Sequence, residues 1–373
     1  MLLSQLTTKG LALCASISLS RLLSRISPCV AMTTMVSEMK KFKKAVHKIG
    51  THNGTFHCDE VLAVSMLKML PECQDAEIIR SRDEDMLKEC DIVVDVGAVY
   101  DPDNHRYDHH QKSFTETMQS VSGGRKPWTT RLSSAGLVYH HFGRDVLAAR
   151  LGDAPADTHE VLYDRLYQTF VEEIDAVDNG INQYDGTPRY QVTSTIGARV
   201  SRLNPAWNDP EPDERGRFER AMALVTAEFG EALRRLHTVW LPARQLVEAA
   251  LRDRHRVHPS GLIAELPAGG APWKDHLFTL EQQLEPPAQV MFMLYTDQNG
   301  NWRVQTVPPF VGSFDMRVPL KKSWRGLRDD ELSKESGISG CVFVHASGFI
   351  GGAKSRESVL EMALQSLREA DKL

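Results

Sequence analysis

Short apolar runs alternate with amphipathic segments in the first half of the chain. Residues 45–50 and 92–94 form two such runs, and the second consists only of Ile and Val. Residues 60–70, between them, carry apolar side chains at helical spacing, which predicts a helix after the first strand. A β-branched run that ends in Asp95 fits a buried parallel strand. This order of elements predicts an α/β fold with a parallel sheet.

Helical spacing recurs in the middle of the chain. Four further helices are predicted there. The first is capped by Ser133-Ser134, and the others begin near Asp157, at Glu214 and at Leu241. Gly180 is the predicted C-cap of the second of these helices. A stretch rich in turn-forming residues, 204–213, precedes the last two helices, which we expect to connect two domains.

From residue 258 the pattern becomes rich in strands. Four strands are predicted, at residues 262–266, 289–295, 302–307 and 341–344. Residues 297–301 between the second and third strands have the composition of a hairpin turn. A final helix is predicted from Ser355 to about Ala370. The C-terminal part of the chain is therefore expected to form a smaller α+β domain.

Composition places the chain among globular proteins of two or three domains. Its 373 residues are 42% hydrophobic, enough for two cores, and no apolar run is long enough to span a bilayer. The six cysteines are scattered without a Cys-x2-Cys pair, which argues against both a zinc ribbon and a disulfide framework. A soluble protein from a reducing compartment is expected, without contact to a membrane.

The first 45 residues read as a leader. No acidic residue precedes Glu38, and Lys9, Arg21 and Arg25 lie among serines and leucines, which is typical of a mitochondrial transit peptide. A secretory signal is the rival, but the two arginines interrupt its apolar stretch. The basic run at residues 40–44 fits a nuclear localisation signal or an ordinary solvated surface.

Polar residues collect where the predicted strands end. His52, His57 and Asp59 follow the first strand, Asp95 ends the second, and Asp108, His109 and His110 come later. Ligand sites in open α/β sheets gather at the carboxyl ends of strands. Imidazole and carboxylate groups bind ions such as Mn²⁺, and two such ions can clamp a phosphoryl group during attack by water. The conjunction predicts phosphoester hydrolysis, although each motif alone would more often be polar surface.

Two residue choices stay open in the sequence. Asp175 and Asp178 are three residues apart on one helical face, so either one could bind metal while the other supports it or is solvated. Cys58 lies between two candidate ligands and could be a nucleophile or a zinc ligand. We favour a small buried apolar role for Cys58, because it points away from the site if its neighbours point in along an extended loop.

The ordered motifs resemble those of the DHH phosphoesterase superfamily. The segments most similar to its MYG branch, the melanocyte-proliferating-gene exonucleases, are residues 50–60, 107–111, 177–180 and 345–352. The resemblance runs from about Ile49 to about Leu367. It implies a DHH-type domain at residues 46–203, connecting helices at residues 204–257 and a substrate-binding domain at residues 258–373.

The resemblance implies a metal-dependent exonuclease that degrades single-stranded RNA from its 3′ end, in mitochondria and the nucleus. One ion would be held by His52, His57 and Asp95, and the other by Asp59, Asp95, His109 and Asp178. His110 would face the scissile phosphate, and Asp108 would orient an adjacent histidine. Many DHH enzymes have an aspartate at the position of His57. We therefore favour Mn²⁺ over Mg²⁺ as a hypothesis.

Substrate contacts are expected in the C-terminal domain. A glycine-bearing loop before the last helix would hold a phosphate through backbone amides, and the candidates around it are His345, Ser347, Gly348, Gly351, Gly352 and Lys354. The superfamily often has histidine where this chain has Ala353, so His345 or Lys354 would have to substitute for it. Trp324 and Arg325 suit base stacking and phosphate contact, and a Trp packed within its own domain is the alternative.

Other functions remain compatible with these residues. The net charge of −5 offers no general attraction to nucleic acid, although local groups such as Arg125, Lys126 and Arg131 could supply it. The same ligands would serve a small-molecule phosphatase or pyrophosphatase. A metal-stabilised scaffold without turnover is a third reading, and the sequence does not fix the oligomeric state.

Overall fold

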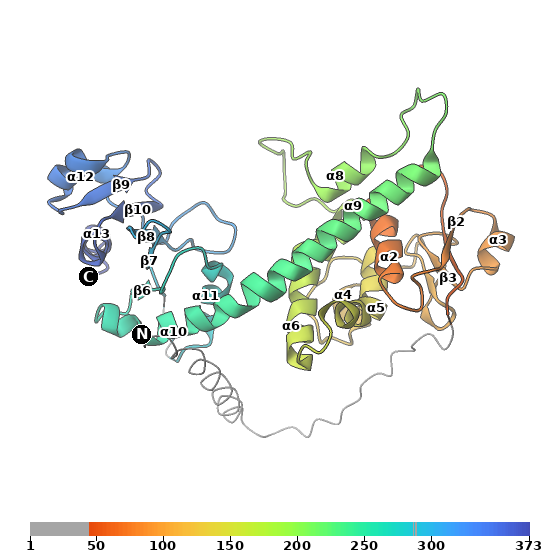
Figure 1. Cartoon of the computed structure of the whole chain (residues 1–373), viewed down its shortest axis with the longest axis horizontal. Helices are drawn as coiled ribbons and strands as arrows, with labels where there is room; N and C mark the ends of the chain where they lie inside the picture. Colours follow the sequence, from red (N-terminus) through yellow and green to blue (C-terminus); the bar gives the residue numbers. More distant parts are fainter. Residues whose placement is uncertain (1–44, 286, 288) are drawn as a thin grey trace, which may run out of the picture. The chain divides into compact units, whose positions relative to one another are not determined.

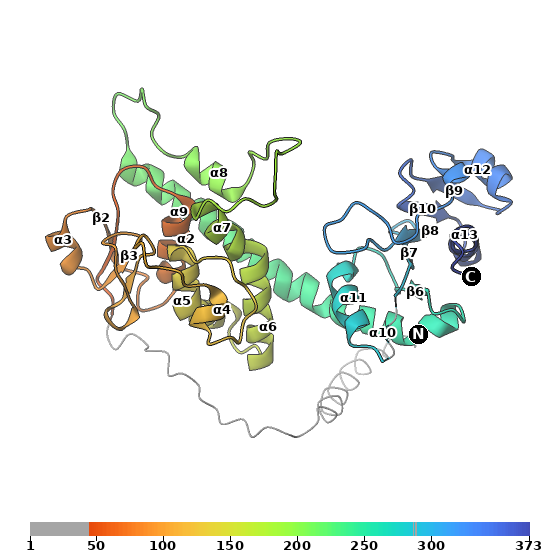
Figure 2. The same ribbon diagram turned by 180° about the vertical axis from the view of Figure 1, so that it is seen from behind.

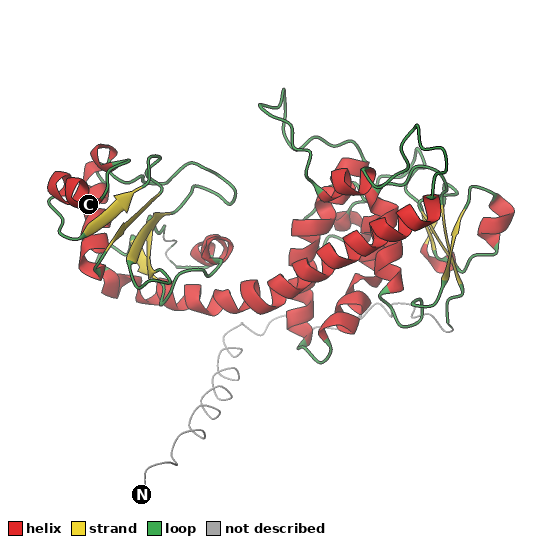
Figure 3. Ribbon diagram, turned by 45° about the horizontal axis from the view of Figure 1, so that its top comes forward, coloured by secondary structure: helices red, strands yellow, loops and turns green. Residues whose placement is uncertain are grey.

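The structure is a computed structural model that describes residues 45–373 except 286 and 288 (Figure 1). The predicted leader, except Ala45, and the whole basic run lie outside the described residues. The strands form two five-stranded sheets, drawn in yellow in Figure 3. Within the part of the chain that the structure describes, no helix combines the length and the apolar character needed to cross a bilayer.

The first sheet confirms the predicted parallel arrangement. Its strands, in spatial order, are β2 (Glu77–Arg80), β1 (Lys48–Thr51), β3 (Ile92–Val94), β5 (Arg106–Tyr107) and β4 (Tyr100–Asp101). The first four are parallel, and β4 pairs antiparallel with β5. The chain passes from β1 to β2 on one side and then returns to place β3 on the other. The carboxyl ends of β1 and β3 therefore flank a topological switch point, where α/β proteins bind ligands.

Helices surround this sheet, and α2 (Cys58–Lys68) is the most buried of them. The others are α3 (Glu84–Lys88), α4 (Met118–Val121), α5 (Ser134–Leu151), α6 (Ala156–Leu166), α7 (Glu172–Asp178) and α8 (Ile196–Ser201), with a π-helical stretch at Tyr167–Val171. Helix α2 packs against α5 and α9, and α8 lies along α9 (Figure 2). Of the two predicted cap residues, Ser133 caps α5 and Ser134 is its first residue.

The two predicted connecting helices are one continuous helical stretch. Helix α9 (Glu214–Arg235) passes through a π-helical stretch, Leu236–Trp240, directly into α10 (Leu241–Val257). Pro242 lies in the first turn of α10, directly after the π-helical stretch. The sequence predicted two helices here, whereas the structure has one continuous helical stretch.

The second sheet has a mixed topology. Its strands, in spatial order, are β6 (Ile263–Glu265), β7 (Phe292–Thr296), β8 (Trp302–Thr306), β10 (Ile350–Ala353) and β9 (Cys341–Val344). Only β6 and β7 are parallel. The associated helices are α11 (Trp273–Gln282), α12 (Asp329–Ser336) and α13 (Arg356–Glu369). One core packs the sheet against α13, and a second core packs β6 and β7 against α10 and α11.

The predicted glycine loop is largely a strand, which corrects the sequence interpretation. Gly351 and Gly352 lie in β10, which pairs with β8 on one side and with β9 on the other. A Cβ at Gly351 would lie 3.0 Å from the Met362 side chain of α13, and one at Gly352 would collide with the Arg303 guanidinium. The two glycines therefore serve close packing, and their backbone lies inside the sheet rather than in an open phosphate-binding loop.

Candidate metal centre

The candidate ligands converge at the switch point of the first sheet. His52 follows β1, Asp95 follows β3, and the Asp108–His110 segment follows β5. Asp59 lies in the first turn of α2, which begins two residues before the start that we predicted. Asp178 is the last residue of α7. Segments that are distant in sequence thus bring the predicted ligands to one place.

Asp95 is the centre of this arrangement. It has a positive φ of 58°, which a non-glycine residue adopts at a cost and which is common at functional sites. Its Oδ2 lies 3.4 Å from Nε2 of His52, and its Oδ1 lies 3.4 Å from Nε2 of His109. Ser134 Oγ donates a hydrogen bond of 3.0 Å to the same Oδ1. The Asp95 carboxylate therefore lies between the two imidazoles.

Two main groups of ligand atoms surround Asp95. The first contains His52, His57, Glu60 and Asp95, and the second contains Asp59, His109 and Asp178. Within each group the ligand atoms lie within 4.8 Å of one another. A third, overlapping group combines Asp95, His109 and His110. These groups correspond to the two ligand sets implied by the resemblance, with Glu60 added.

The sequence interpretation missed Glu60. Its carboxylate accepts hydrogen bonds from the backbone N–H of His57 at 2.8 and 2.9 Å, and its Oε1 lies 3.0 Å from Nε2 of His52. Glu60 therefore caps α2 and contacts a candidate ligand at the same time. Its spacing from His57 is that of a capping box, which is the one signal that could have drawn attention to it.

The electrostatics of the centre fit a bound cation. Asp59 is 1% exposed, and neither of its carboxylate oxygens has a hydrogen-bond partner among the described residues. Burial, and then the nearby carboxylates of Asp95 and Asp178, raise the pKa of Asp59 well above its ordinary value. A buried carboxylate without a partner is costly unless it is neutralised or binds a metal. The mixed imidazole and carboxylate ligands suit a divalent transition metal such as Mn²⁺.

The two imidazoles beside Asp95 carry protons in the metal-free protein. Burial lowers the pKa of His52, but hydrogen bonds with Asp95 and Glu60 outweigh it and raise the pKa to about 10. Burial also lowers the pKa of His109, and hydrogen bonds with Asp178 and Asp95 raise it to about 9. These protons partly balance the carboxylates, and metal binding must displace them.

Asp108 holds His110 rather than binding at the centre itself. Its Oδ1 accepts hydrogen bonds from Nδ1 of His110 at 2.7 Å and from the His110 backbone N–H at 3.1 Å. Its Oδ2 accepts a hydrogen bond from the backbone of Ala98 at 2.6 Å. The His110 side chain is 61% exposed, so it is accessible from solvent. This geometry agrees with the orienting role that the resemblance implies for Asp108.

The structure separates Asp175 from Asp178. Asp178 Oδ2 lies 3.0 Å from Nε2 of His109. Asp175 is fully buried and accepts hydrogen bonds from Ser133, Gly136 and Tyr167. These contacts tie α7 to the start of α5. Asp178 therefore belongs to the ligand cluster, and Asp175 supports the fold behind it.

A clamp from a distant residue holds the loop before α2. The Asn204 side chain accepts a hydrogen bond of 2.9 Å from the Phe56 backbone N–H and donates one of 2.8 Å to the Phe56 carbonyl. The buried Phe56 ring packs edge-on against Phe218 of α9, and Arg80 lies over both rings. The residue before His57 is thus fixed by its backbone and by its side chain.

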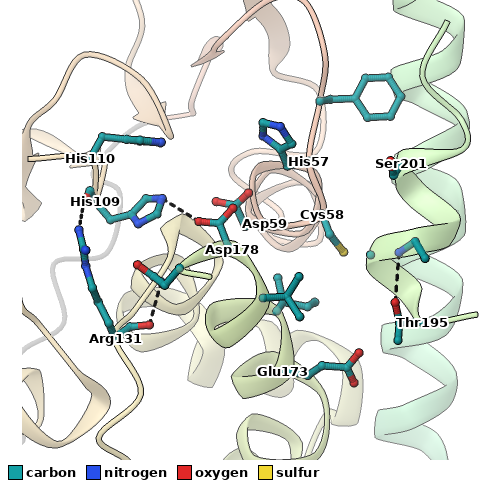
Figure 4. Close-up of a pocket in the computed structure, with 16 residues that line it drawn as sticks. His57, Cys58, Asp59, His109, His110, Arg131, Glu173, Asp178, Thr195 and Ser201 are labelled. Carbon is teal, nitrogen blue, oxygen red and sulfur yellow. Dashed lines mark hydrogen bonds and ion pairs between the residues drawn. The ribbon is translucent and has the colours of Figure 1, made fainter. Parts of the chain in front are cut away.

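The ligand cluster opens into a cavity of about 740 Å³. Figure 4 shows His109, Asp178 and Asp59 on one side of the cavity and Thr195 and Ser201 of α8 on the other. This is within the range of roughly 300–1,000 Å³ that is usual for ligand sites.

Two side chains of this cavity correct the sequence interpretation. Cys58 begins a helix and lines the cavity instead of pointing away on an extended loop. Burial raises the pKa of its thiol to about 12, which keeps it neutral and unsuited to nucleophilic attack. Arg131 also lines the cavity and donates a 2.8 Å hydrogen bond to the His109 carbonyl. It is not part of a basic patch with Lys126, which pairs with Glu160 and Asp164.

The predicted substrate residues of the C-terminal part belong to the second sheet. Trp324 is 1% exposed and lies in the core, so it is not available to stack on a base. Arg325 donates a hydrogen bond to the Leu320 carbonyl. Gly348 forms the turn before β10 with a φ of 82°. His345 and Ser347 are exposed and bonded to each other, and Lys354 is also exposed.

Comparisons with known proteins place the chain in the family that its motifs resemble. The model of the MYG1 exonuclease family, described as an uncharacterised protein family (UPF0160), matches residues 48–367. Human MYG1 exonuclease is 58% identical over 324 residues, which cover 86% of each chain. The MYG1 protein C27H6.8 of Caenorhabditis elegans is 47% identical over 86% of this chain and 94% of its own.

A solved structure also aligns with the chain. It is an exopolyphosphatase-related protein from Bacteroides fragilis, with a TM-score of 0.22 and 12% identity over 88% of this chain and 93% of its own, a similarity too low to support an argument. The family model and the relatives, in contrast, cover most of the described residues. This chain belongs to the MYG1 exonuclease family.

Proposed function

We propose that this protein is a 3′ to 5′ exoribonuclease that uses two divalent metal ions, with Mn²⁺ favoured. Membership of a family whose named relatives are exonucleases supports nuclease activity. The observation that carries the metal centre is the buried Asp59 carboxylate, which has no hydrogen-bond partner among the described residues and faces His109 and Asp178. RNA as the substrate and the 3′ direction rest on the resemblance of the motifs.

The ligand groups define which side chains would hold the ions. His52, His57 and Glu60 with Asp95 would hold one, and Asp59, His109 and Asp178 the other, with Asp95 shared. Two divalent cations in these positions would acidify a water for attack on phosphorus and neutralise charge on the phosphoryl oxygens. Ser134 fixes the rotamer of Asp95 through its hydrogen bond to Oδ1.

His110 would stabilise charge on the phosphoryl group. Nδ1 of His110 donates a hydrogen bond to the Asp108 carboxylate, and this bond raises the pKa of His110 above its ordinary value. With Nδ1 engaged by Asp108, Nε2 is the atom that can donate to a phosphoryl oxygen. Arg131 adds a permanent positive charge to the cavity wall, and its bond to the His109 carbonyl limits its movement.

The proposed location is the mitochondrion and the nucleus. It rests on the acid-free leader with its arginines and on the basic run at residues 40–44. A fluorescent fusion of the full chain should label both compartments. Removal of residues 1–31 should leave only the nuclear signal, and unchanged mitochondrial labelling would contradict the proposed transit peptide.

The test of the activity is a time course with RNA labelled at its 5′ end. The full chain with Mn²⁺ should produce a ladder that shortens from the 3′ end, and chelation should stop it. Asp95→Asn is the control, because it preserves the shape of the shared ligand and removes its charge. Intact RNA together with release of phosphate from pyrophosphate or nucleotides would replace the exonuclease by a small-molecule phosphatase. Metal binding without any turnover would support a metal-stabilised scaffold without catalytic activity.

A further inference from the structure

The cavity at the metal centre has two chemically different halves. One half contains the ligands Asp59, His109 and Asp178. The other half is a slot, which we define by its apolar and small lining residues: Phe56, Cys58, Ile174, Val177, Gly197 and Ala198. In Figure 4 the slot lies between Cys58 and the helix that carries Thr195 and Ser201. A substrate phosphate at the ligands would thus have an apolar space beside it.

Small residues on α8 keep the slot open. A Cβ added at Gly197 would find its nearest neighbour, the Cys58 Cβ, at 3.9 Å, which is ordinary contact. Gly197 has a helical backbone without a positive φ, so its lack of a side chain is not required by the backbone. Glycine inside a helix costs about 1 kcal/mol relative to alanine, which makes an unneeded glycine here unfavourable. Gly197 therefore leaves open space beside Cys58 in the cavity.

The polar features of the cavity restrict what that occupant is. The unpartnered carboxylate of Asp59, which is 1% exposed, lines the same cavity and suits a cation at the adjacent ligands. At the rim of the slot are Glu173, Thr195 and Ser201, whereas its walls are apolar. A ligand that joins a charged group to a flat apolar ring with polar edges fits both halves. A nucleotide has this form.

We propose that the slot holds the base of the 3′-terminal nucleotide. This inference rests on the proposed exonuclease function. During hydrolysis the oxygen of water forms a bond to phosphorus, the bond from phosphorus to O3′ of the preceding nucleotide breaks, and that O3′ takes up a proton. The phosphate stays with the terminal nucleoside, whose base occupies the slot. Apolar walls accept all four bases, so cleavage is independent of the terminal base.

The test fills the slot. Gly197→Leu places a branched apolar side chain in it, Gly197→Ala adds only one carbon, and Gly230→Leu is the matched control on α9, where a Cβ would also meet nothing within 4 Å. Each full-length variant is assayed on RNA with an ordinary and with an abasic 3′-terminal residue. Binding of uridine 5′-monophosphate in the presence of Mn²⁺ is measured by calorimetry. Unfolding midpoints and Mn²⁺ affinity report whether the fold and the ligands are preserved.

We expect the wild type to have a KM about tenfold or more lower for the ordinary end than for the abasic end, as a contact with one base provides. Gly197→Leu should abolish this difference and weaken binding of the monophosphate by a similar factor. Gly197→Ala should have a smaller effect in the same direction, and Gly230→Leu should keep both properties. If Gly197→Leu remains folded and still discriminates, or if the wild type does not discriminate, the slot is not a base site.

The two proposals fail in different ways. If the wild type binds uridine 5′-monophosphate, loses that binding in Gly197→Leu and yet cleaves no RNA, the slot is supported and the exonuclease is not. If RNA is shortened equally by the wild type and by Gly197→Leu, with equal KM for both kinds of end, the exonuclease stands and the base site is overturned. A Gly197→Leu chain that does not fold is replaced by Ala198→Leu, which fills the slot from the next residue.

Discussion

The edge of the first sheet and the core beside the second sheet each bury an acidic side chain, but in opposite ways. Asp59 has no hydrogen-bond partner for either oxygen among the described residues. Glu281 of α11 accepts two hydrogen bonds of 2.8 Å from Arg317 and one of 2.6 Å from the Val290 backbone. A buried acid that is fully bonded stabilises a fold, whereas one without partners indicates a missing cation. The contrast separates structural from functional acids within one chain.

The largest expected effect is the loss of activity in Asp95→Ala. Asp95 contacts both His52 and His109, so its removal disturbs both ligand groups. The loss should exceed the roughly 10- to 100-fold typical of residues that only support metal ligands. Steady-state cleavage and Mn²⁺ titration measure it. Glu281→Gln is the contrasting variant. Equal losses of activity in the two folded proteins would contradict the distinction between functional and structural acids.

Stability should change in opposite directions at the two acids. Glu281→Gln leaves the largely buried Arg317 without its carboxylate, and we expect a loss of roughly 3–5 kcal/mol of unfolding free energy. Asp59→Asn removes an unpartnered charge and should leave the metal-free protein as stable as the wild type or more so. Denaturant unfolding with a chelator present measures both. A strongly destabilised Asp59→Asn would show that Asp59 has a structural role.

Asp175 and Asp178, three residues apart on α7, show the same contrast between an acid that supports the fold and an acid of the ligand cluster. Asp175→Ala leaves the buried donors of Ser133, Gly136 and Tyr167 without an acceptor, which should cost about 1–3 kcal/mol. Asp178→Asn should weaken Mn²⁺ binding with little change in stability. Parallel unfolding and calorimetric titration separate these effects. If a folded Asp175→Ala variant bound Mn²⁺ more weakly than the wild type while Asp178→Asn bound it equally well, Asp175 rather than Asp178 would be the metal ligand.

The smallest expected effect is a pH dependence of metal affinity. In the metal-free protein the pKa of His52 is about 10 and that of His109 is about 9, so both are protonated at pH 7. Ligation requires the neutral imidazole, and bound Mn²⁺ therefore displaces protons. Affinity should rise with pH up to about 10, more steeply below about 9 where both protons are displaced, by at most roughly tenfold per unit for each proton. Calorimetry in buffers of different ionisation enthalpy counts the protons, and a count of zero at pH 7 would contradict this.

The sequence predicted those parts of the centre that depend on strand order. Short β-branched runs followed by His52, Asp95 and the Asp108–His110 segment predicted a parallel sheet with ligands at its edge, as the topology shows. Glu60 was missed because its capping position gives it an ordinary explanation. The choice between Asp175 and Asp178 needed tertiary contacts, since both share one face of α7.

The second sheet shows why other elements could not be predicted. Glycine disfavours strands, so Gly351 and Gly352 read as a loop. Their place in β10 becomes clear only when Arg303 and Met362 are packed against them. Trp324 is another case, because a Trp beside cations suits both a core and a nucleic-acid surface. Only the fold shows that it is buried.

The clamp by Asn204 has a consequence for biosynthesis. A chain growing from its N-terminus makes His52 early, yet it lacks a complete ligand set until Asp178 has been synthesised. The loop before α2 forms its hydrogen bonds with the Asn204 side chain only after Asn204 has been synthesised, 148 residues beyond Phe56. Incomplete chains therefore carry the metal-binding motifs without a formed centre. The fold thus delays assembly of the site until most of the first sheet's helices exist.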